Sequence, residues 1–232
     1  GKDNYAGVTW NNAPDERRIL IGWMNNWQYA NEVPTEGWRG AATFPRELGL
    51  EKVGNRYLLT SDPVPEIEKL YGKKVNLKKM ISGTESISDK IPFPKVPIEI
   101  TLTFNLANKT KMGFPNKYGI TLKNSKGEYY TVGYDNIDKC FYADRTRATG
   151  ENFSSSFPSL HFAPYIVREA EITWRMIIDV SSVELFAADG KAVITDLVFP
   201  SDIFDEIELF AENGRIEMIG GTVSELNSIW NK

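Results

Sequence analysis

The amino-acid sequence predicts an all-β protein whose larger, C-terminal part is a β-sandwich. Three observations support this prediction. Apolar and polar residues alternate with a period of two over short runs, as in Ile98–Phe104. Turn signals that contain glycine separate these runs at intervals of about 8–12 residues. Only one segment has the pattern of a helix, so about ten strands after residue 72 must cover one another, which a sandwich achieves.

The first 62 residues predict one small sheet. Residues 17–24, 41–50 and 56–60 have the pattern of strands, and Gly54-Asn55 provides turn chemistry between the last two. A single sheet of three or four strands leaves one face uncovered. We therefore expect this segment to be part of something larger.

A proline-rich segment, Asp62-Pro63-Val64-Pro65, leads into the one predicted helix, over residues 66–71. Three apolar side chains share one face of it: Ile67, Leu70 and Tyr71. Gly72 supplies a stop. This is the best boundary in the chain, which we divide into residues 1–62, a linker helix at 63–72 and the sandwich at 73–232.

Hairpin signals connect the strands of the predicted sandwich. Gly127, Asp189-Gly190 and Asn213-Gly214 each lie between two alternating runs. The predicted strands are residues 98–104, 118–122, 129–134, 140–144, 172–180, 182–187, 193–199, 207–211 and 215–226.

Composition excludes several classes of protein. Hydrophobic residues at 41% and charged residues at 25% are typical of a globular chain. A net charge of -4 gives no support to nucleic-acid binding, and no apolar run approaches the ~18 residues of a membrane span. One histidine and the lone Cys140 exclude a histidine-rich metal site and an internal disulfide framework. We expect no metal and no cofactor.

The N-terminal segment differs from the rest in its aromatic residues. It holds four of the six tryptophans: Trp10, Trp23, Trp27 and Trp38. The stretch that contains them carries motifs in a fixed order. These are residues 3–6 (DNYA), 19–29 (ILIGWMNNWQY), 34–40 (PTEGWRG) and 44–48 (FPREL). Residues 144–146 (DRT), 153–154 (FS), 179–186 (DVSSVELF) and 189–190 (DG) follow in the sandwich.

In these motifs the chain closely resembles glycoside hydrolase family 32, which includes levanases, inulinases and invertases. The resemblance implies a five-bladed β-propeller followed by a β-sandwich, of which this chain holds the last part of the propeller and the whole sandwich. It also implies that the three catalytic carboxylates lie on earlier blades, so we predict no catalytic residue here. Asn26 stands where a nucleophilic aspartate would be, and an amide cannot attack a glycosidic carbon.

The resemblance makes Trp23 the best candidate for substrate contact, as an apolar wall beside a terminal fructosyl unit. Asn25, Asn26 and Trp27 are weaker candidates, because asparagines also form turns. Asp3 could reach the pocket of an intact enzyme, but it could instead order the sheet or lie loose at the start of the chain. We expect Arg39, Arg46 and Glu47 to form structural ion pairs between propeller and sandwich.

Polar residues of the sandwich favour structural roles. Asp144 beside Arg145 indicates an ordinary salt bridge, and Glu184 has no identifiable partner carboxylate for acid–base work. His161 lies in an apolar neighbourhood that suggests a packed edge. Five aromatic residues could form a sugar platform, although on alternating strands the core is the favoured interpretation. They are Tyr129, Tyr130, Tyr134, Phe141 and Tyr142.

The sequence thus predicts the C-terminal part of a hydrolase that acts on fructans or sucrose, with the sandwich as its support. The alternative is a non-catalytic carbohydrate-binding module. The expected partners are the sugar, bound through the complete enzyme, and the missing N-terminal propeller portion. Ile19, Ile21 and Trp23 should be partly exposed and could drive self-association through open blade edges. Polysaccharide substrates favour an extracellular or periplasmic enzyme, whose signal peptide would lie upstream of this chain.

Overall fold

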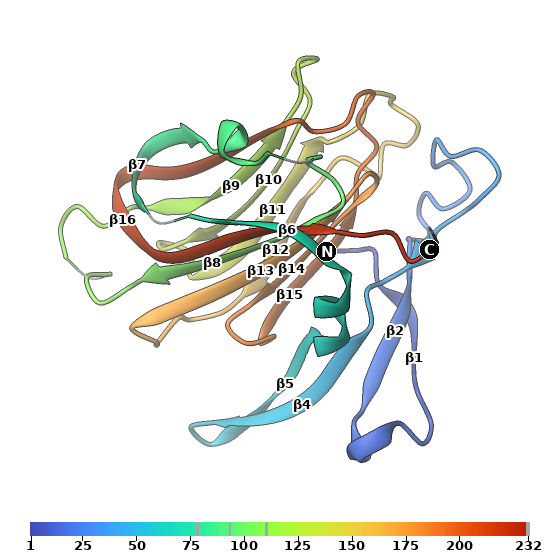
Figure 1. The fold of residues 1–232 in the computed structure, drawn as a ribbon, viewed down its shortest axis with the longest axis horizontal. Helices are drawn as coiled ribbons and strands as arrows, with labels where there is room; N and C mark the ends of the chain where they lie inside the picture. The colour runs from blue at the N-terminus through green and yellow to red at the C-terminus, as the bar shows by residue number, and fades with distance from the viewer. Residues whose placement is uncertain (78, 93, 110, 231–232) are drawn as a thin grey trace.

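The computed structural model describes residues 1–77, 79–92, 94–109 and 111–230, and it is all-β, as predicted. Figure 1 shows a small sheet from the N-terminal part of the chain beside a larger body. The small sheet runs in the order β1-β2-β4-β5, with β3 paired to β2, and every pair is antiparallel. Its strands are β1 (Tyr5–Thr9), β2 (Ile19–Met24), β3 (Ala41–Ala42), β4 (Arg46–Val53) and β5 (Arg56–Pro63).

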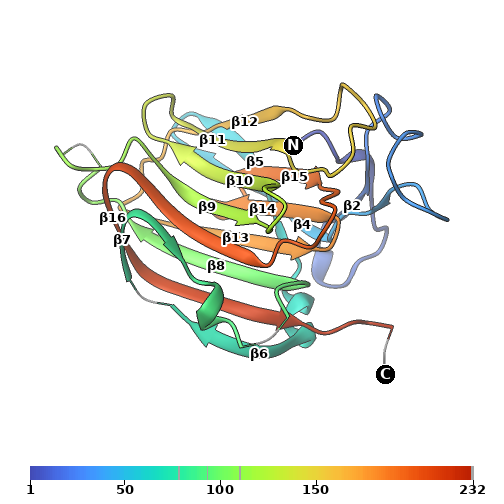
Figure 2. The same ribbon diagram turned by 90° about the horizontal axis from the view of Figure 1, so that it is seen from above.

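The larger body is the predicted sandwich, formed by one hydrogen-bonded sheet that folds into two layers. Its strands follow the order β12-β11-β10-β9-β16-β8-β13-β14-β15, and β6 and β7 also pair with β16. Figure 2 shows β12, β11, β10 and β9 lying side by side in the first layer. The strands are β6 (Tyr71–Asn76), β7 (Lys79–Ser86), β8 (Ile98–Asn105), β9 (Lys117–Lys123), β10 (Tyr129–Asp135), β11 (Cys140–Arg147), β12 (Leu160–Pro164), β13 (Glu171–Asp179), β14 (Ser182–Ala187), β15 (Ala192–Leu197) and β16 (Glu206–Leu226).

Strand β16 belongs to both layers. Its first part pairs with β9 over residues 206–212, and its second part pairs with β8 over residues 217–225. The register shifts between Ala211 and Arg215, and Asn213 has a φ of 57°. The prediction of a hairpin at Asn213-Gly214 was therefore wrong. The turn chemistry there makes an irregular corner that lets one strand pass between layers.

The predicted helix is a 3-10 helix at Pro65–Leu70. It ends one residue earlier than expected, because Tyr71 already pairs with Leu226 in the sandwich. Two shorter 3-10 helices lie at Pro14–Glu16 and Ser88–Lys90. Strands β1, β6, β7 and β12 were not predicted from the sequence. Strands β1, β6 and β7 contain glycine or lysine and show little alternation of apolar and polar residues, and β12 is only five residues long. Their sequences therefore carry a weak strand pattern.

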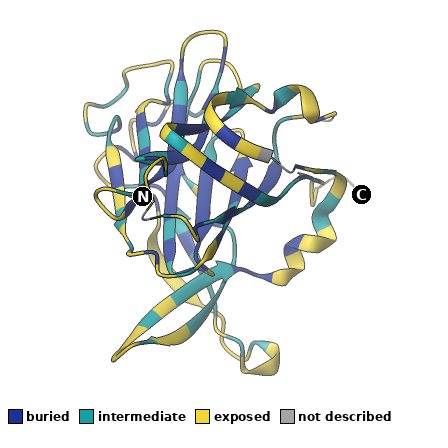
Figure 3. Cartoon of the chain, turned by 90° about the vertical axis from the view of Figure 1, so that its left-hand side faces the viewer, coloured by how far each residue is buried: buried dark blue, intermediate teal, exposed yellow. Residues whose placement is uncertain are grey.

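The core lies between the two layers of the sandwich, as the buried inner faces in Figure 3 show. Tyr118 from β9 stacks on Trp174 from β13, with ring centroids 5.4 Å apart. Phe104 contacts both rings edge-on at 5.1 Å. Tyr130, Tyr134 and Phe141 are also buried here, so the preference for a core interpretation holds for these three aromatic residues.

Candidate functional site

Three aromatic side chains cluster at the surface of the small sheet and the loop after β2, and we call them the aromatic wall: the exposed Tyr5 and Trp27 and the half-buried Trp23. Tyr5 lies opposite Trp23 in the pairing of β1 with β2. The ring centroids of Trp23 and Trp27 are 5.3 Å apart, and Tyr5 lies 6.3 and 6.5 Å from them. Trp27 is 68% exposed and Tyr5 is 52% exposed. Exposure of this much clustered aromatic surface indicates a binding or packing face.

Hydrogen bonds hold the loop that carries this wall. Trp23 donates its indole N–H to the carbonyl of Arg39 at 3.4 Å. Asn26 donates to the carbonyl of Lys2 at 3.2 Å and accepts from the amide of Gln28 at 2.9 Å. Asn26 thus remains at the surface beside the wall, with its amide engaged in shaping the loop.

The structure separates the five predicted sugar contacts into two groups. Trp23, Asn26 and Trp27 lie together at the surface, whereas Asn25 and Asp3 are fully buried. Asn25 accepts from the amide of Asn26 at 2.8 Å, and its Nδ2 has no partner among the described residues. A side chain without exposed surface cannot touch a ligand in this arrangement, so the geometry gives no support to sugar contacts by Asn25 and Asp3. Tyr5 was missed, because only strand pairing brings it to Trp23.

Asp3 instead lies at the junction of the small sheet and the sandwich, which we call the seam. Its carboxylate accepts from the Tyr29 hydroxyl, from Arg145 Nη1 at 2.5 Å and from the amide of Leu197 at 2.8 Å. Arg145 also donates to Tyr29 at 2.7 Å, and its guanidinium lies 4.2 Å above the ring of Phe157. Burial, and then the charge of Asp3, raise the pKa of Tyr29, which keeps its phenol a donor. The predicted salt bridge between Asp144 and Arg145 was therefore wrong.

A second buried ion pair crosses the seam. Arg46 donates to Glu184 and to Thr195, both at 2.5 Å, and the amide of Phe44 donates to Glu184 at 2.8 Å. Arg46 thus joins the two parts as expected, while Arg39 and Glu47 do not. Arg39 donates to carbonyls of its own loop, and Glu47 pairs with Arg17 inside the N-terminal part at 2.9 Å.

His161 completes a polar network near the seam. Its Nδ1 lies 2.6 Å from Asp196 and its Nε2 lies 2.8 Å from the hydroxyl of Ser159, the order of a Ser-His-Asp triad. Ser159 also donates to the carbonyl of Phe157 at 3.1 Å, and Tyr130 donates to Asp196 at 2.9 Å. Burial alone would raise the pKa of Asp196, but the contact with His161 and the charge of Arg145 hold it below its usual range. We assign this network a structural role.

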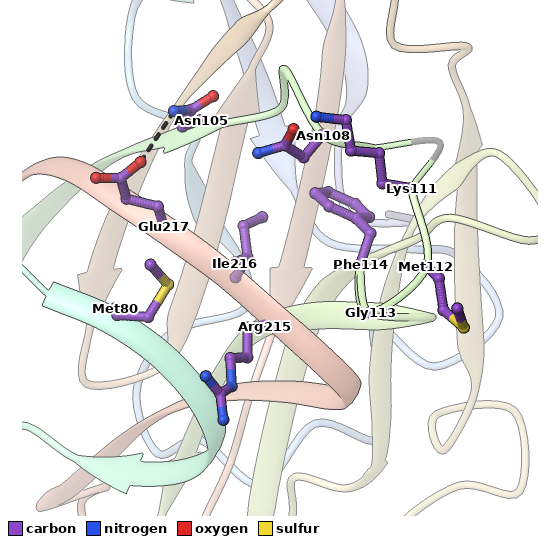
Figure 4. A pocket seen from close by; sticks show the side chains of 10 residues that line it. All are labelled: Met80, Asn105, Asn108, Lys111, Met112, Gly113, Phe114, Arg215, Ile216 and Glu217. Atoms are coloured by element: carbon purple, nitrogen blue, oxygen red, sulfur yellow. Dashed lines mark hydrogen bonds between the residues drawn. The ribbon is translucent and has the colours of Figure 1, made fainter.

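Two cavities lie in the sandwich, away from the aromatic wall. Figure 4 shows one of about 350 Å³ between β16 and the segment that follows β8, where Met80, Phe114 and Ile216 contribute apolar surface. At its rim Asn105 donates to Glu217 at 2.9 Å. A larger groove of about 940 Å³ crosses β9, β10, β11, β12 and β16. Neither surface includes Tyr5, Trp23 or Trp27.

Within residues 1–77, 79–92, 94–109 and 111–230, no group of three or more His, Cys, Asp or Glu side chains could hold a metal ion. No helix in the same ranges is both long and apolar enough to cross a membrane.

Comparison with known proteins accounts for both parts of the chain. Residues 66–229 match the C-terminal domain of glycosyl hydrolases family 32, and residues 1–63 match the N-terminal domain of the same family. A levanase of Bacillus subtilis (strain 168) is 33% identical over 99% of this chain, which corresponds to 34% of the levanase. The extracellular exo-inulinase of Aspergillus niger is 27% identical over all of this chain, which spans 43% of it.

Solved structures show the same arrangement. The exo-inulinase from Aspergillus awamori is similar with a TM-score of 0.83 and 25% identity, over 99% of this chain and 44% of that one. A β-fructofuranosidase from Schwanniomyces occidentalis, complexed with fructosyl-erythritol, shares the fold with a TM-score of 0.84 and 21% identity, over 98% of this chain and 48% of that one. The chain spans less than half the length of these relatives. It belongs to glycosyl hydrolase family 32, and comprises the C-terminal domain of that family and the end of its N-terminal domain.

Proposed function

We propose that this chain is the C-terminal portion of an exported β-fructofuranosidase-type glycoside hydrolase that acts on fructans or sucrose. One observation carries the proposal. The aromatic wall of Tyr5, Trp23 and Trp27 lies exposed on a sheet that matches the end of the family's N-terminal domain. The levanase and exo-inulinase relatives support fructans as the substrate class. Their polymeric substrates, and the extracellular exo-inulinases among them, favour an extracellular or periplasmic location.

The aromatic wall has the chemistry of one side of a sugar pocket. The C–H face of a fructosyl unit packs against an aromatic ring, while its hydroxyls need polar partners. Trp23 and Trp27 provide adjacent rings, and the side chain of Asn26 lies at the surface beside them. A wall of this kind orients the sugar. The opposite side of the pocket would come from earlier blades.

The bond-breaking groups belong to those earlier blades in this proposal. An aspartate attacks the anomeric carbon of the β-fructofuranosyl unit, and a glutamate protonates the leaving oxygen. Water then attacks the anomeric carbon of the fructosyl-enzyme while the glutamate takes its proton. The aspartate carboxylate is released, and fructose leaves with retained configuration. No residue of this chain takes part in proton transfer or nucleophilic attack.

The sandwich acts as the support of the small sheet. Its Arg145 and Glu184 side chains each neutralise a buried charge on the N-terminal part, Asp3 and Arg46 respectively. Separating the two parts would leave these charges unpaired, which costs free energy, so the ion pairs hold the small sheet on the sandwich. The wall therefore keeps a fixed position relative to the rest of the pocket.

Two measurements test the proposal. The 232-residue chain should release no detectable fructose from levan, inulin or sucrose, and robust release would refute the assignment of the carboxylates to earlier blades. In the complete enzyme, Trp23→Ala should lower kcat/KM for sucrose about tenfold or more, equivalent to about 1.4 kcal/mol of transition-state binding.

Trp38→Ala is the matched control, since Trp38 is a partly exposed tryptophan of the same segment outside the aromatic wall. It should leave kcat/KM within about twofold of the parent value. Equal losses in the two variants would show that tryptophan removal acts through stability, and would contradict the aromatic wall as a sugar contact.

A further inference from the structure

The outer face of the first sandwich layer carries the largest groove we describe, about 940 Å³ in volume. Its residues come from β7, β9, β10, β11, β12 and the first part of β16. The small sheet contacts the other layer through Glu184 on β14 and Arg175 on β13, and Asp3 before it also reaches β11 through its buried pair with Arg145. None of these contact residues, and none of the aromatic wall, lines the groove.

Two buried glycines that pair with each other, Gly133 of β10 and Gly119 of β9, lie beneath aromatic rings on this face of the sheet. Aromatic rings lean over them from the flanking strands. A Cβ atom at Gly133 would lie 2.8 Å from the ring of Tyr142, and one at Gly119 would lie 3.1 Å from the ring of Phe210. Phe162 pairs with Tyr142 at the next strand and is 60% exposed. Strand pairing thus places an aromatic row across the sheet, and the rings of Tyr142 and Phe210 cover the two glycines at its centre.

A row of polar side chains runs beside the aromatic row, two residues away along each strand, or about 7 Å. Register places Thr131 opposite both Asp144 and Thr121, and Thr121 opposite Glu208. The hydroxyl oxygens of Thr121 and Thr131 lie 3.0 Å apart. The separation of the two rows matches the width of a sugar ring, whose C–H face and hydroxyls then meet opposite kinds of partner.

Charge selects the class of ligand. The lining holds five carboxylates against one lysine, Lys117, which disfavours a polyanion. They are Asp135, Asp138, Asp144, Glu208 and Glu212. Lysines neutralise two of them, with Lys117 at 3.3 Å from Asp135 and Lys123 at 2.6 Å from Glu208. The groove is therefore rich in hydrogen-bond acceptors, which fits a hydroxyl-rich chain that carries no negative charge.

We propose that this face of the sandwich is a second carbohydrate site, which holds a neutral oligosaccharide chain away from the aromatic wall. The aromatic row supplies the stacking surface, and the threonine and carboxylate row accepts and donates hydrogen bonds to the sugar hydroxyls. The site would retain a polymer while its end is processed elsewhere. That the polymer is a fructan rests on the proposed function, whereas the existence of the groove does not.

Isothermal titration of the 232-residue chain tests the proposal with levan, inulin and cello-oligosaccharides. We expect a Kd of about 1 mM or tighter for levan or inulin oligosaccharides. Phe162→Ala and Thr131→Val should each weaken binding about tenfold. Both side chains are on the outer face, and circular dichroism with thermal unfolding would verify that the variants remain folded.

The other layer offers a matched control. Thr103 and Thr173 form a similar hydroxyl pair at 3.0 Å on β8 and β13, outside the groove. Thr173→Val should leave the Kd unchanged.

Each alternative outcome is decisive. Loss of binding in Trp23→Ala alone would overturn the groove and leave the proposed function intact. Binding of cello-oligosaccharides without fructans would support the groove and count against the proposed substrate class. Absence of binding to all three sugars would overturn the carbohydrate site and favour a protein partner for this face.

Discussion

The two sides of the small sheet differ in how completely their side chains are partnered. On the seam, Asp3 and Arg46 are buried and each forms an ion pair with the sandwich. On the open side, Tyr5, Val8 and Trp27 are more than half exposed. Both kinds of residue are uncommon in folded proteins: charged side chains are seldom buried, and clustered aromatic rings are seldom exposed.

This contrast indicates which part of the protein each side of the small sheet packs against. A buried charge is tolerated only with a partner in place, so the seam is complete within this chain. A contiguous apolar face on one side of a sheet indicates a missing covering layer or ligand. The side of the small sheet that faces the sandwich is thus fully packed within this chain. The other side remains uncovered, and in the family it would face the rest of the N-terminal domain.

The largest effect should follow from breaking the seam. Arg145→Met leaves the Asp3 carboxylate buried without its counter-charge, which should lower the free energy of unfolding by about 3–5 kcal/mol. Urea denaturation would measure it. Lys126→Met is the control, because the Lys126–Asp202 pair is solvent-exposed at 3.8 Å and should contribute less than about 1 kcal/mol.

A compensating variant sharpens this test. Asp3→Asn combined with Arg145→Met removes both charges, and the double variant should be more stable than Arg145→Met alone. Equal stability of the two variants would contradict an unpaired buried charge as the cause of the loss.

The second effect concerns the tip of the β14–β15 hairpin, where it contacts the small sheet. Gly190 has a φ of 73°, and an added Cβ would lie 2.6 Å from the backbone of Ser61. Gly54 has a φ of 61° at the tip of the β4–β5 hairpin, with no atom within 4 Å of its added Cβ. Both alanine variants carry left-handed strain of about 1–2 kcal/mol, but Gly190→Ala should lose about 1–3 kcal/mol more through the clash.

Thermal unfolding of the two variants measures the difference. Equal losses would mean that the hairpin tip moves away from Ser61 at little cost, and the seam would then be looser than the structure indicates. A larger loss for Gly190→Ala would locate part of the seam's stability at this backbone contact.

The sequence predicted the features that depend on a local pattern of residues, such as single strands. The alternation of residues 98–104 and 172–180 identified β8 and β13, and motif order identified the family. Pairings over long separations could not be predicted in this way. Asp3 and Arg145 meet across 142 positions, and Arg46 and Glu184 across 138. In a single sequence a buried ion pair has no signature that distinguishes it from surface charge.

The site was predicted in part for the same reason. Trp23 and Trp27 are close in sequence, and the motif around them signalled an aromatic face. Tyr5 reaches that face only through the register of β1 on β2, across a shift in pairing between Tyr5 and Val8. Likewise, Gly119 and Gly133 are ordinary glycines in the sequence, and only the pairing of β9 with β10 places them side by side beneath the rings of Phe210 and Tyr142.

The smallest effect concerns self-association through the uncovered side of the small sheet. Among the described strands, β1 pairs only with β2 and β5 only with β4, so each is an edge strand, although Ser61 near the end of β5 donates its N–H to the carbonyl of Gly190. Val8 on β1 and Leu59 on β5 are both more than half exposed. We expect the chain to dimerise weakly through these edges. Val8→Lys or Leu59→Lys should each raise the dimer dissociation constant about tenfold, or about 1.4 kcal/mol.

Sedimentation velocity over a concentration series would measure this shift. Val180→Lys is the control, since Val180 is similarly exposed but lies at the β13–β14 turn of the sandwich. It should leave the dissociation constant unchanged. A strictly monomeric parent chain would contradict association through the open edges. Because the seam would be intact in that monomer, the result would also show that the sandwich alone holds the small sheet in solution without a covering layer.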